Sequence, residues 1–163
     1  MFLWMVSAFN YFLINFQLRY LKGDIYRNQI ISSLSEVAAY LVSGAIGAKL
    51  GIRVCLIVSF LIALVGSILL VLYEDMGHSV MAMILATKFG ISSCFSAVYL
   101  ANSLFPPLYA STTLGICNFL ARLVSMIAPP FAEFDKPLPM ILFALLSLAG
   151  TFVSMFLRTA KSE

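Results

Sequence analysis

The sequence predicts an all-α polytopic membrane protein, with six transmembrane helices in a single domain over residues 1–163. The first observation behind this prediction is composition, because 62% of the residues are hydrophobic and only 10% are charged. Soluble domains are about 25% charged, so this chain has too few polar side chains to cover a surface that faces water. The second observation is that the apolar residues form long runs without strand-like alternation. A lipid-facing backbone must then satisfy its hydrogen bonds within helices.

Each helix that crosses a bilayer of roughly 30 Å needs about 20 apolar residues. Six segments have this length: 2–21, 28–48, 54–73, 79–101, 112–131 and 137–157. Most of the charged residues fall in the short connections between them. These six segments are therefore the predicted transmembrane helices of a multi-pass integral membrane protein.

The first segment lacks the basic residues and the small-residue cleavage site of a signal peptide, so it is interpreted as a retained helix. Pro106 and Pro107 are expected in the connection before the fifth helix, and Pro129 and Pro130 are expected to end that helix. Six helices place both termini on one side of the membrane. Lysine and arginine are balanced between the two sides, and the distribution of acidic residues favours cytoplasmic termini.

Composition and motifs also exclude several classes of function. The net charge of +3 comes from scattered basic residues, with no cluster that could follow a nucleic-acid backbone. The three cysteines lie in separate apolar segments without metal-binding spacing, so they are interpreted as packing residues. The chain contains no H-E-x-x-H, G-x-S-x-G or P-loop motif. The sequence therefore predicts neither an enzyme nor a cofactor, metal or nucleic-acid site.

Three ionisable residues, Glu36, Lys88 and Arg122, lie near the middle of predicted helices. A basic residue at that depth costs about 2.5–3.5 kcal/mol on insertion scales, so such residues are candidates for function. The alternative is a structural ion pair of Glu36 with Lys88 or with Arg122. Glu36 is a candidate either for proton coupling or for the counter-charge of Arg122.

Polar residues at helical spacing accompany these charges on four of the six predicted helices. The stripes are Asn10 and Gln17; Glu36, Tyr40 and Ser43; Lys88, Ser92, Phe95 and Tyr99; and Asn118 and Arg122. One polar stripe is ordinary in a membrane bundle, whereas four predict a shared hydrated cavity. The sequence therefore predicts a pathway for a solute.

The connection "GAIGAKLGIR", residues 44–53, resembles the loop motif of the major facilitator superfamily, G-x-x-x-D-R-x-G-R-R. The matching residues are Gly44, Lys49, Gly51 and Arg53. Ala48 replaces the aspartate of that motif, and Ile52 replaces one of its basic residues.

Residues 86–131 resemble the organic cation, anion and carnitine transporter family of the same superfamily. The family pattern is approximately G-K-F-x-I-x-x-x-F…Y-T-x-E-L-Y-P-T-x-x-R-x-x-x-x-G…R-x-x-x-x-x-x-P. The residues in register are Lys88, Phe89, Ile91, Phe95, Tyr99, Leu104, Pro106, Gly115, Arg122 and Pro129. Residues 134–148 also look like the start of the family's last helix.

This resemblance implies the carboxy-terminal six-helix half of a twelve-helix carrier, which holds its substrate between two halves. Members of the family move small organic ions. The position of Arg122 is basic in anion- and carnitine-type members, which favours an anionic or zwitterionic substrate. The implied substrate-binding residues are Arg122, Lys88, Asn118, Glu36, Tyr40 and Tyr99, and the implied gating-loop residues are Gly44, Lys49, Gly51 and Arg53.

The chain departs from the family at Ser103, Ala110 and Ala48, where the pattern has charged gating residues. This loss implies a weaker inward gate, or a chain that no longer transports. A six-helix half cannot enclose a two-sided cavity alone. The chain is therefore a fragment of a carrier, a half that pairs with a second half or with itself, or a structural or accessory subunit that does not transport.

Overall fold

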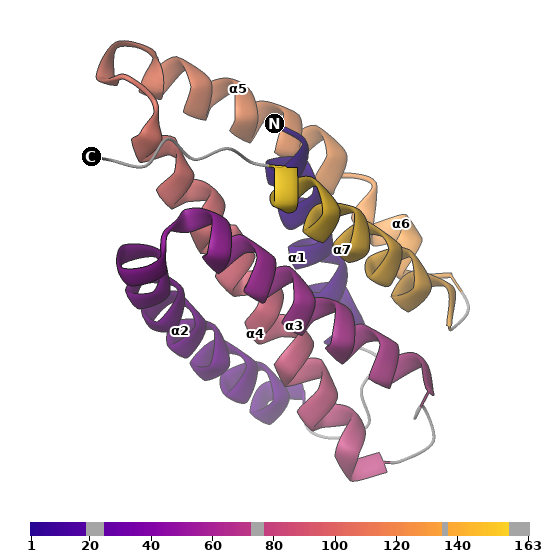
Figure 1. The fold of residues 1–163 in the computed structure, drawn as a ribbon. Helices are drawn as coiled ribbons and strands as arrows, with labels where there is room; N and C mark the ends of the chain where they lie inside the picture. Colours follow the sequence, from indigo (N-terminus) through magenta and orange to yellow (C-terminus); the bar gives the residue numbers. More distant parts are fainter. Residues whose placement is uncertain (19–24, 73–76, 135–136, 157–163) are drawn as a thin grey trace.

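The computed structural model describes residues 1–18, 25–72, 77–134 and 137–156, which are helical almost throughout (Figure 1). The helices are α1 (Phe2–Gln17), α2 (Ile25–Leu50), α3 (Ile52–Leu72), α4 (Gly77–Ala101), α5 (Pro107–Ser125), α6 (Ala128–Ala132) and α7 (Leu138–Phe156), with a 3-10 turn at Asn102–Leu104. No strand occurs in these ranges. The all-α class predicted from the sequence is confirmed.

Among the residues that the structure describes, four helices are long and apolar enough to cross a membrane: α2, α3, α4 and α7. The described part of α1 has 16 residues, which is shorter than a typical span. The count of six transmembrane helices therefore stays a prediction. The predicted helices at 28–48, 54–73, 79–101 and 137–157 each overlap one of these four. Residues 19–21, 73 and 157 of the predicted helices lie outside the described residues.

The helices form two layers. In the first layer α2 packs on α4, α4 on α1, and α1 on α5. In the second layer α3 and α7 pack on each other, with α3 against α4 and α7 against α1 (Figure 1). The second layer covers one face of the four-helix row, and no helix of the described residues covers the opposite face.

Glycines allow α3 and α4 to approach closely. A Cβ atom at Gly90 would lie 2.5 Å from the backbone nitrogen of Ala63, and one at Gly66 would lie 2.4 Å from Oγ1 of Thr87. Small residues at helix contacts of this kind are typical of membrane bundles, where packing rather than water drives association. The contact fixes the position of α4, which carries Lys88.

The boundaries predicted for the fifth helix, 112–131, are wrong at both ends. It begins at Pro107 because a proline in the first turn lacks only a donor that would be unpaired there anyway. It ends at Ser125 because Pro129 and Pro130 cannot donate hydrogen bonds to the carbonyls four residues before them, and they stand in the short helix α6 instead. Arg122 consequently lies in the last turn of α5, not in the middle of a helix.

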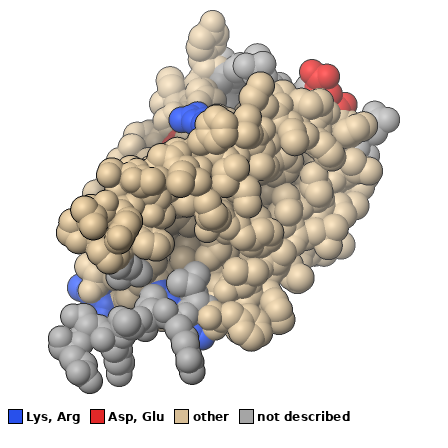
Figure 2. Space-filling view, turned by 90° about the horizontal axis from the view of Figure 1, so that it is seen from above, with Lys and Arg blue, Asp and Glu red and all other residues tan. Residues whose placement is uncertain are grey.

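The outside of the bundle carries many apolar side chains. On α2, Ile30, Leu34 and Leu41 are 62%, 66% and 72% exposed. Figure 2 shows a face on which charged side chains are few and lie toward the margins of the molecule. Such a surface is suited to contact with lipid.

Candidate functional site

The uncovered face contains a buried ion pair between α2 and α4. The side chain of Lys88 is only 1% exposed, and its Nζ lies 3.6 Å from Oε2 of Glu36. Lys88 Nζ also donates a hydrogen bond of 2.7 Å to Oδ1 of Asn15 on α1. The ion pair expected as an alternative for Glu36 therefore forms, and its partner is Lys88.

Two tyrosines complete the surroundings of the Glu36 carboxylate. The hydroxyls of Tyr11 and Tyr40 each donate a hydrogen bond of 2.5 Å to Glu36 Oε1. The amide of Asn15 donates to the backbone carbonyl of Tyr11 at 2.9 Å, one turn earlier on α1. Three helices thus hold one carboxylate and one ammonium group in a connected network.

Aromatic rings extend this network along α4 toward α5. Phe95 stacks on Tyr11 and packs against Tyr99, with 5.1 Å between ring centroids in each pair. Tyr99 also packs against Trp4 at 4.7 Å and donates a hydrogen bond of 2.7 Å to Oδ1 of Asn118 on α5. The rings therefore join side chains of α1, α4 and α5 into one surface.

Arg122 lies one turn after Asn118 on α5 and is exposed. Its guanidinium carbon is 5.7 Å from the centroid of the Phe12 ring, a cation–π arrangement. Among the residues that the structure describes, no carboxylate pairs with it. Its hydrogen-bond donors are therefore available on the uncovered face.

These residues define a surface that we call the polar face. Its members are Tyr11, Asn15, Glu36, Tyr40, Lys88, Phe95, Tyr99, Asn118 and Arg122. An open hollow of about 430 Å³ lies within it, lined by Tyr40, Phe95, Ser96, Tyr99 and Leu100. All six residues expected to bind substrate lie on this face, and their role in binding stays a prediction.

The polar stripe expected on the first helix, Asn10 and Gln17, does not lie on the polar face. Asn10 is buried against α7 and donates hydrogen bonds to Oγ of Ser147 at 3.1 Å and to the carbonyl of Phe143 at 3.4 Å. Gln17 donates to the carbonyl of Ala132 at 3.2 Å. Tyr11 and Asn15 take their place on the polar face. Their spacing of four residues was the signal in the sequence that could have identified them.

The loop motif lies at the junction of α2 and α3, away from the polar network. Gly51 has φ of +88°, a conformation that glycine adopts without strain, and it separates the two helices. Arg53 donates a hydrogen bond to the carbonyl of Met155 near the end of α7. Lys49 is exposed in the last turn of α2, and Gly44 has open space where a Cβ atom would stand. A gating role for these residues remains a prediction.

The three cysteines, Cys55, Cys94 and Cys117, are buried free thiols. In the described ranges, no three histidine, cysteine or acidic side chains come together in a way that could hold a metal ion. The polar face itself offers hydrogen bonds, an ion pair and aromatic contacts.

Comparison with known proteins identifies relatives of one kind, although no protein-family model matches the chain. It is 30% identical over 161 residues to solute carrier family 22 member 4 of Mus musculus and 28% identical over 162 residues to organic cation/carnitine transporter 2 of Homo sapiens. It is also 25% identical over 159 residues to an organic cation transporter-like protein of Drosophila melanogaster. These alignments cover 94–95% of this chain but only 28–29% of each relative. The chain thus spans about three-tenths of the length of its relatives.

Proposed function

The chain is homologous over nearly its whole length to the organic cation/carnitine transporters of solute carrier family 22, in the major facilitator superfamily, and we propose that it forms the carboxy-terminal six-helix half of a carrier for small organic ions. With these relatives and four apolar helices, it is a multi-pass integral membrane protein. The observation that carries the proposal is the polar face, which brings together side chains of α1, α2, α4 and α5 on the side that α3 and α7 leave uncovered. In this proposal both termini are cytoplasmic.

The charges of the polar face favour an anionic or zwitterionic substrate. Lys88 and Glu36 compensate one another within the bundle. Arg122 remains as an exposed cation, so the face carries a net positive charge among the described residues. A guanidinium can bind a carboxylate through two parallel hydrogen bonds. We therefore assign the anionic group of the substrate to Arg122, with Asn118 beside it.

The aromatic rings give a second reason to expect an organic substrate. Phe95, Tyr99 and Tyr40 line the hollow between α2 and α4. Rings of this kind bury apolar surface and attract cationic groups through their faces. A substrate with a carboxylate and an apolar or cationic body would therefore contact Arg122 at one end and the hollow at the other.

A carrier of this kind needs a second six-helix unit over the polar face. Gly44 on α2 and Gly115 on α5 both have open space where a Cβ atom would stand. Glycines at such positions allow another helix to approach closely. The covering unit is either a second copy of this chain or a separate six-helix half.

Cross-linking in membranes tests the covering unit. The native cysteines are buried, so a cysteine introduced by Asn118→Cys is the reactive thiol. A bifunctional maleimide should give dimers if two copies face one another. Monomers under every condition would count against the second copy and leave a separate half as the covering unit.

Uptake into liposomes tests the transport function and the role of Arg122. The chain is reconstituted and the flux of a labelled organic carboxylate is compared for wild type, Arg122→Ala and Arg122→Lys. Hydrogen bonds to charged groups contribute about 1.5–3 kcal/mol, so Arg122→Ala should reduce flux by about 10- to 150-fold. Arg122→Lys should reduce the flux less than Arg122→Ala does, because lysine keeps the positive charge but lacks the paired donors of arginine.

The matched control is Arg158→Ala, which removes the same charge in the segment after the described residues. Equal flux in wild type and Arg122→Ala would remove Arg122 from the binding site. No flux in any variant, from a folded chain that cross-links as a dimer, would favour the alternative of a structural or accessory subunit. No flux from a chain that stays monomeric is the result expected if the covering unit is a separate half.

A further inference from the structure

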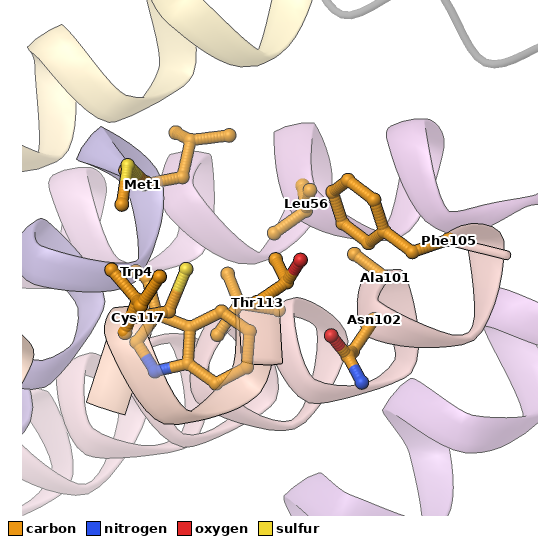
Figure 3. Close-up of a pocket in the computed structure, with 11 residues that line it drawn as sticks. Met1, Trp4, Leu56, Ala101, Asn102, Phe105, Thr113 and Cys117 are labelled. Carbon is orange, nitrogen blue, oxygen red and sulfur yellow. The ribbon is translucent and has the colours of Figure 1, made fainter. Parts of the chain in front are cut away.

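A second, larger cavity lies outside the polar network. Its volume is about 580 Å³, within the range of small-molecule sites. Residues at the start of α1 and α3, at the end of α4 and on α5 form its walls (Figure 3). The lining is mainly apolar and includes Leu56, Val98 and Phe105, and no charged side chain among the described residues contributes to it. A cavity of this composition does not suit an ion.

Two polar groups of the cavity walls lack partners. Oδ1 of Asn102 and Nε1 of Trp4 are both buried and have no hydrogen-bond partner within the described part of the chain. Trp4 as a whole is only 6% exposed. Figure 3 shows the Asn102 oxygen turned toward the side of the cavity where Trp4 and Thr113 lie. Buried polar groups are nearly always paired, because an unpaired one loses its hydrogen bonds to water without replacement.

The unpaired oxygen of Asn102 defines the chemistry that would complement it, because it is an acceptor to which a hydroxyl group can donate a hydrogen bond. Figure 3 shows the six-membered ring of Trp4 turned toward Asn102 and its nitrogen on the far side, so the ring adds apolar surface to the cavity. The rest of the cavity surface is mainly apolar, so it would contact an apolar part of the ligand. We propose that this cavity is a binding site for a small neutral alcohol with an aromatic or aliphatic body.

This site is separate from the proposed substrate site. Neither Arg122 nor the pair of Lys88 and Glu36 lines the cavity. Trp4 links the two sites, because its ring packs against Tyr99 of the polar face. Binding of a ligand in this cavity can be measured without transport.

The test uses Trp4, the single tryptophan of the chain, as an intrinsic reporter. The full chain in lipid vesicles, which add no tryptophan, is titrated with 2-(4-bromophenyl)ethanol, whose bromine quenches indole fluorescence on contact. The comparison compound is 1-bromo-4-ethylbenzene, which has the same ring without the hydroxyl. A hydrogen bond worth about 1–1.5 kcal/mol predicts saturable quenching at about five- to tenfold lower concentration for the alcohol. Asn102→Leu should remove that difference.

A matched pair of variants tests the location. Thr113 lines the cavity, whereas the neighbouring Thr112 is exposed on the same helix. Thr113→Phe should fill the cavity and abolish saturable quenching, and Thr112→Phe should leave it unchanged. Quenching that rises linearly with both compounds in the wild type, as partition into lipid would give, overturns the proposal. Equal quenching by the two compounds also overturns it, even if Thr113→Phe does not fold.

Discussion

Replacing Glu36 by glutamine would separate the two charges at the centre of the polar face. At 3.6 Å, a unit charge pair interacts by about 4.6 kcal/mol at an effective dielectric constant of about 20, and by about 1.2 kcal/mol in water. Glu36 is 15% exposed and Lys88 only 1%, so the lower dielectric applies to the lysine more than to the glutamate. Glu36→Gln leaves the buried Lys88 ammonium without a counter-charge, with only neutral oxygen acceptors such as that of Asn15. We expect a loss of about 2–4 kcal/mol in the free energy of unfolding.

The double variant Glu36→Gln/Lys88→Met tests whether the loss of stability comes from the uncompensated Lys88 ammonium. Removing the stranded ammonium should restore stability, so the double variant should be more stable than Glu36→Gln alone. The free energy is measured by reversible unfolding in sodium dodecyl sulfate from bicelles, followed by far-ultraviolet circular dichroism. Glu133→Gln and Lys49→Met change exposed charges and should shift it by less than about 0.5 kcal/mol. A double variant that is less stable than Glu36→Gln would show that Lys88 does not depend on Glu36.

Two further predictions concern glycines. Gly90→Ala should destabilise the bundle by about 1–3 kcal/mol, because its Cβ would lie 2.5 Å from the backbone nitrogen of Ala63. Gly44→Ala is the control and should not destabilise the bundle, because a Cβ there would lie in open space. Equal unfolding curves for the two variants would contradict the close packing of α3 on α4. Gly51→Ala should lower the free energy of unfolding by about 1–3 kcal/mol, because of the positive φ at that residue. If the same unfolding titration gives the wild-type curve for this variant, the left-handed conformation of Gly51 is excluded.

The sequence predicted the helical class and the positions of Glu36 and Lys88 near the middle of their helices, because both follow from local composition. It failed on the polar stripe of the first helix for a physical reason. Asn10 lies on one polar side of α1, and Tyr11 with Asn15 lies on another. In a membrane the lipid is as apolar as the protein interior, so hydropathy does not determine which side turns inward. Only the packing of α7 against α1 determines that Asn10 is buried.

The fifth helix shows a different limit. Its boundaries depend on backbone donors rather than on hydropathy, and a window of apolar residues does not detect them. Pro107 begins α5 because the first turn needs no donor from it, and Pro129 and Pro130 prevent α5 from continuing. A sequence argument that had followed the missing donors would have placed Arg122 in the last turn.

If a second six-helix unit covers the polar face, it changes the surroundings of Lys88 and of Arg122 to different extents. Lys88 is already buried and compensated by Glu36, so a covering unit changes its surroundings little. Arg122 is exposed, and no carboxylate among the described residues pairs with it. Burying a charge without a counter-charge is strongly unfavourable. Closing the proposed carrier over Arg122 would therefore require an anionic group, supplied by the solute or by the covering unit, and an anionic solute would favour closure for that reason.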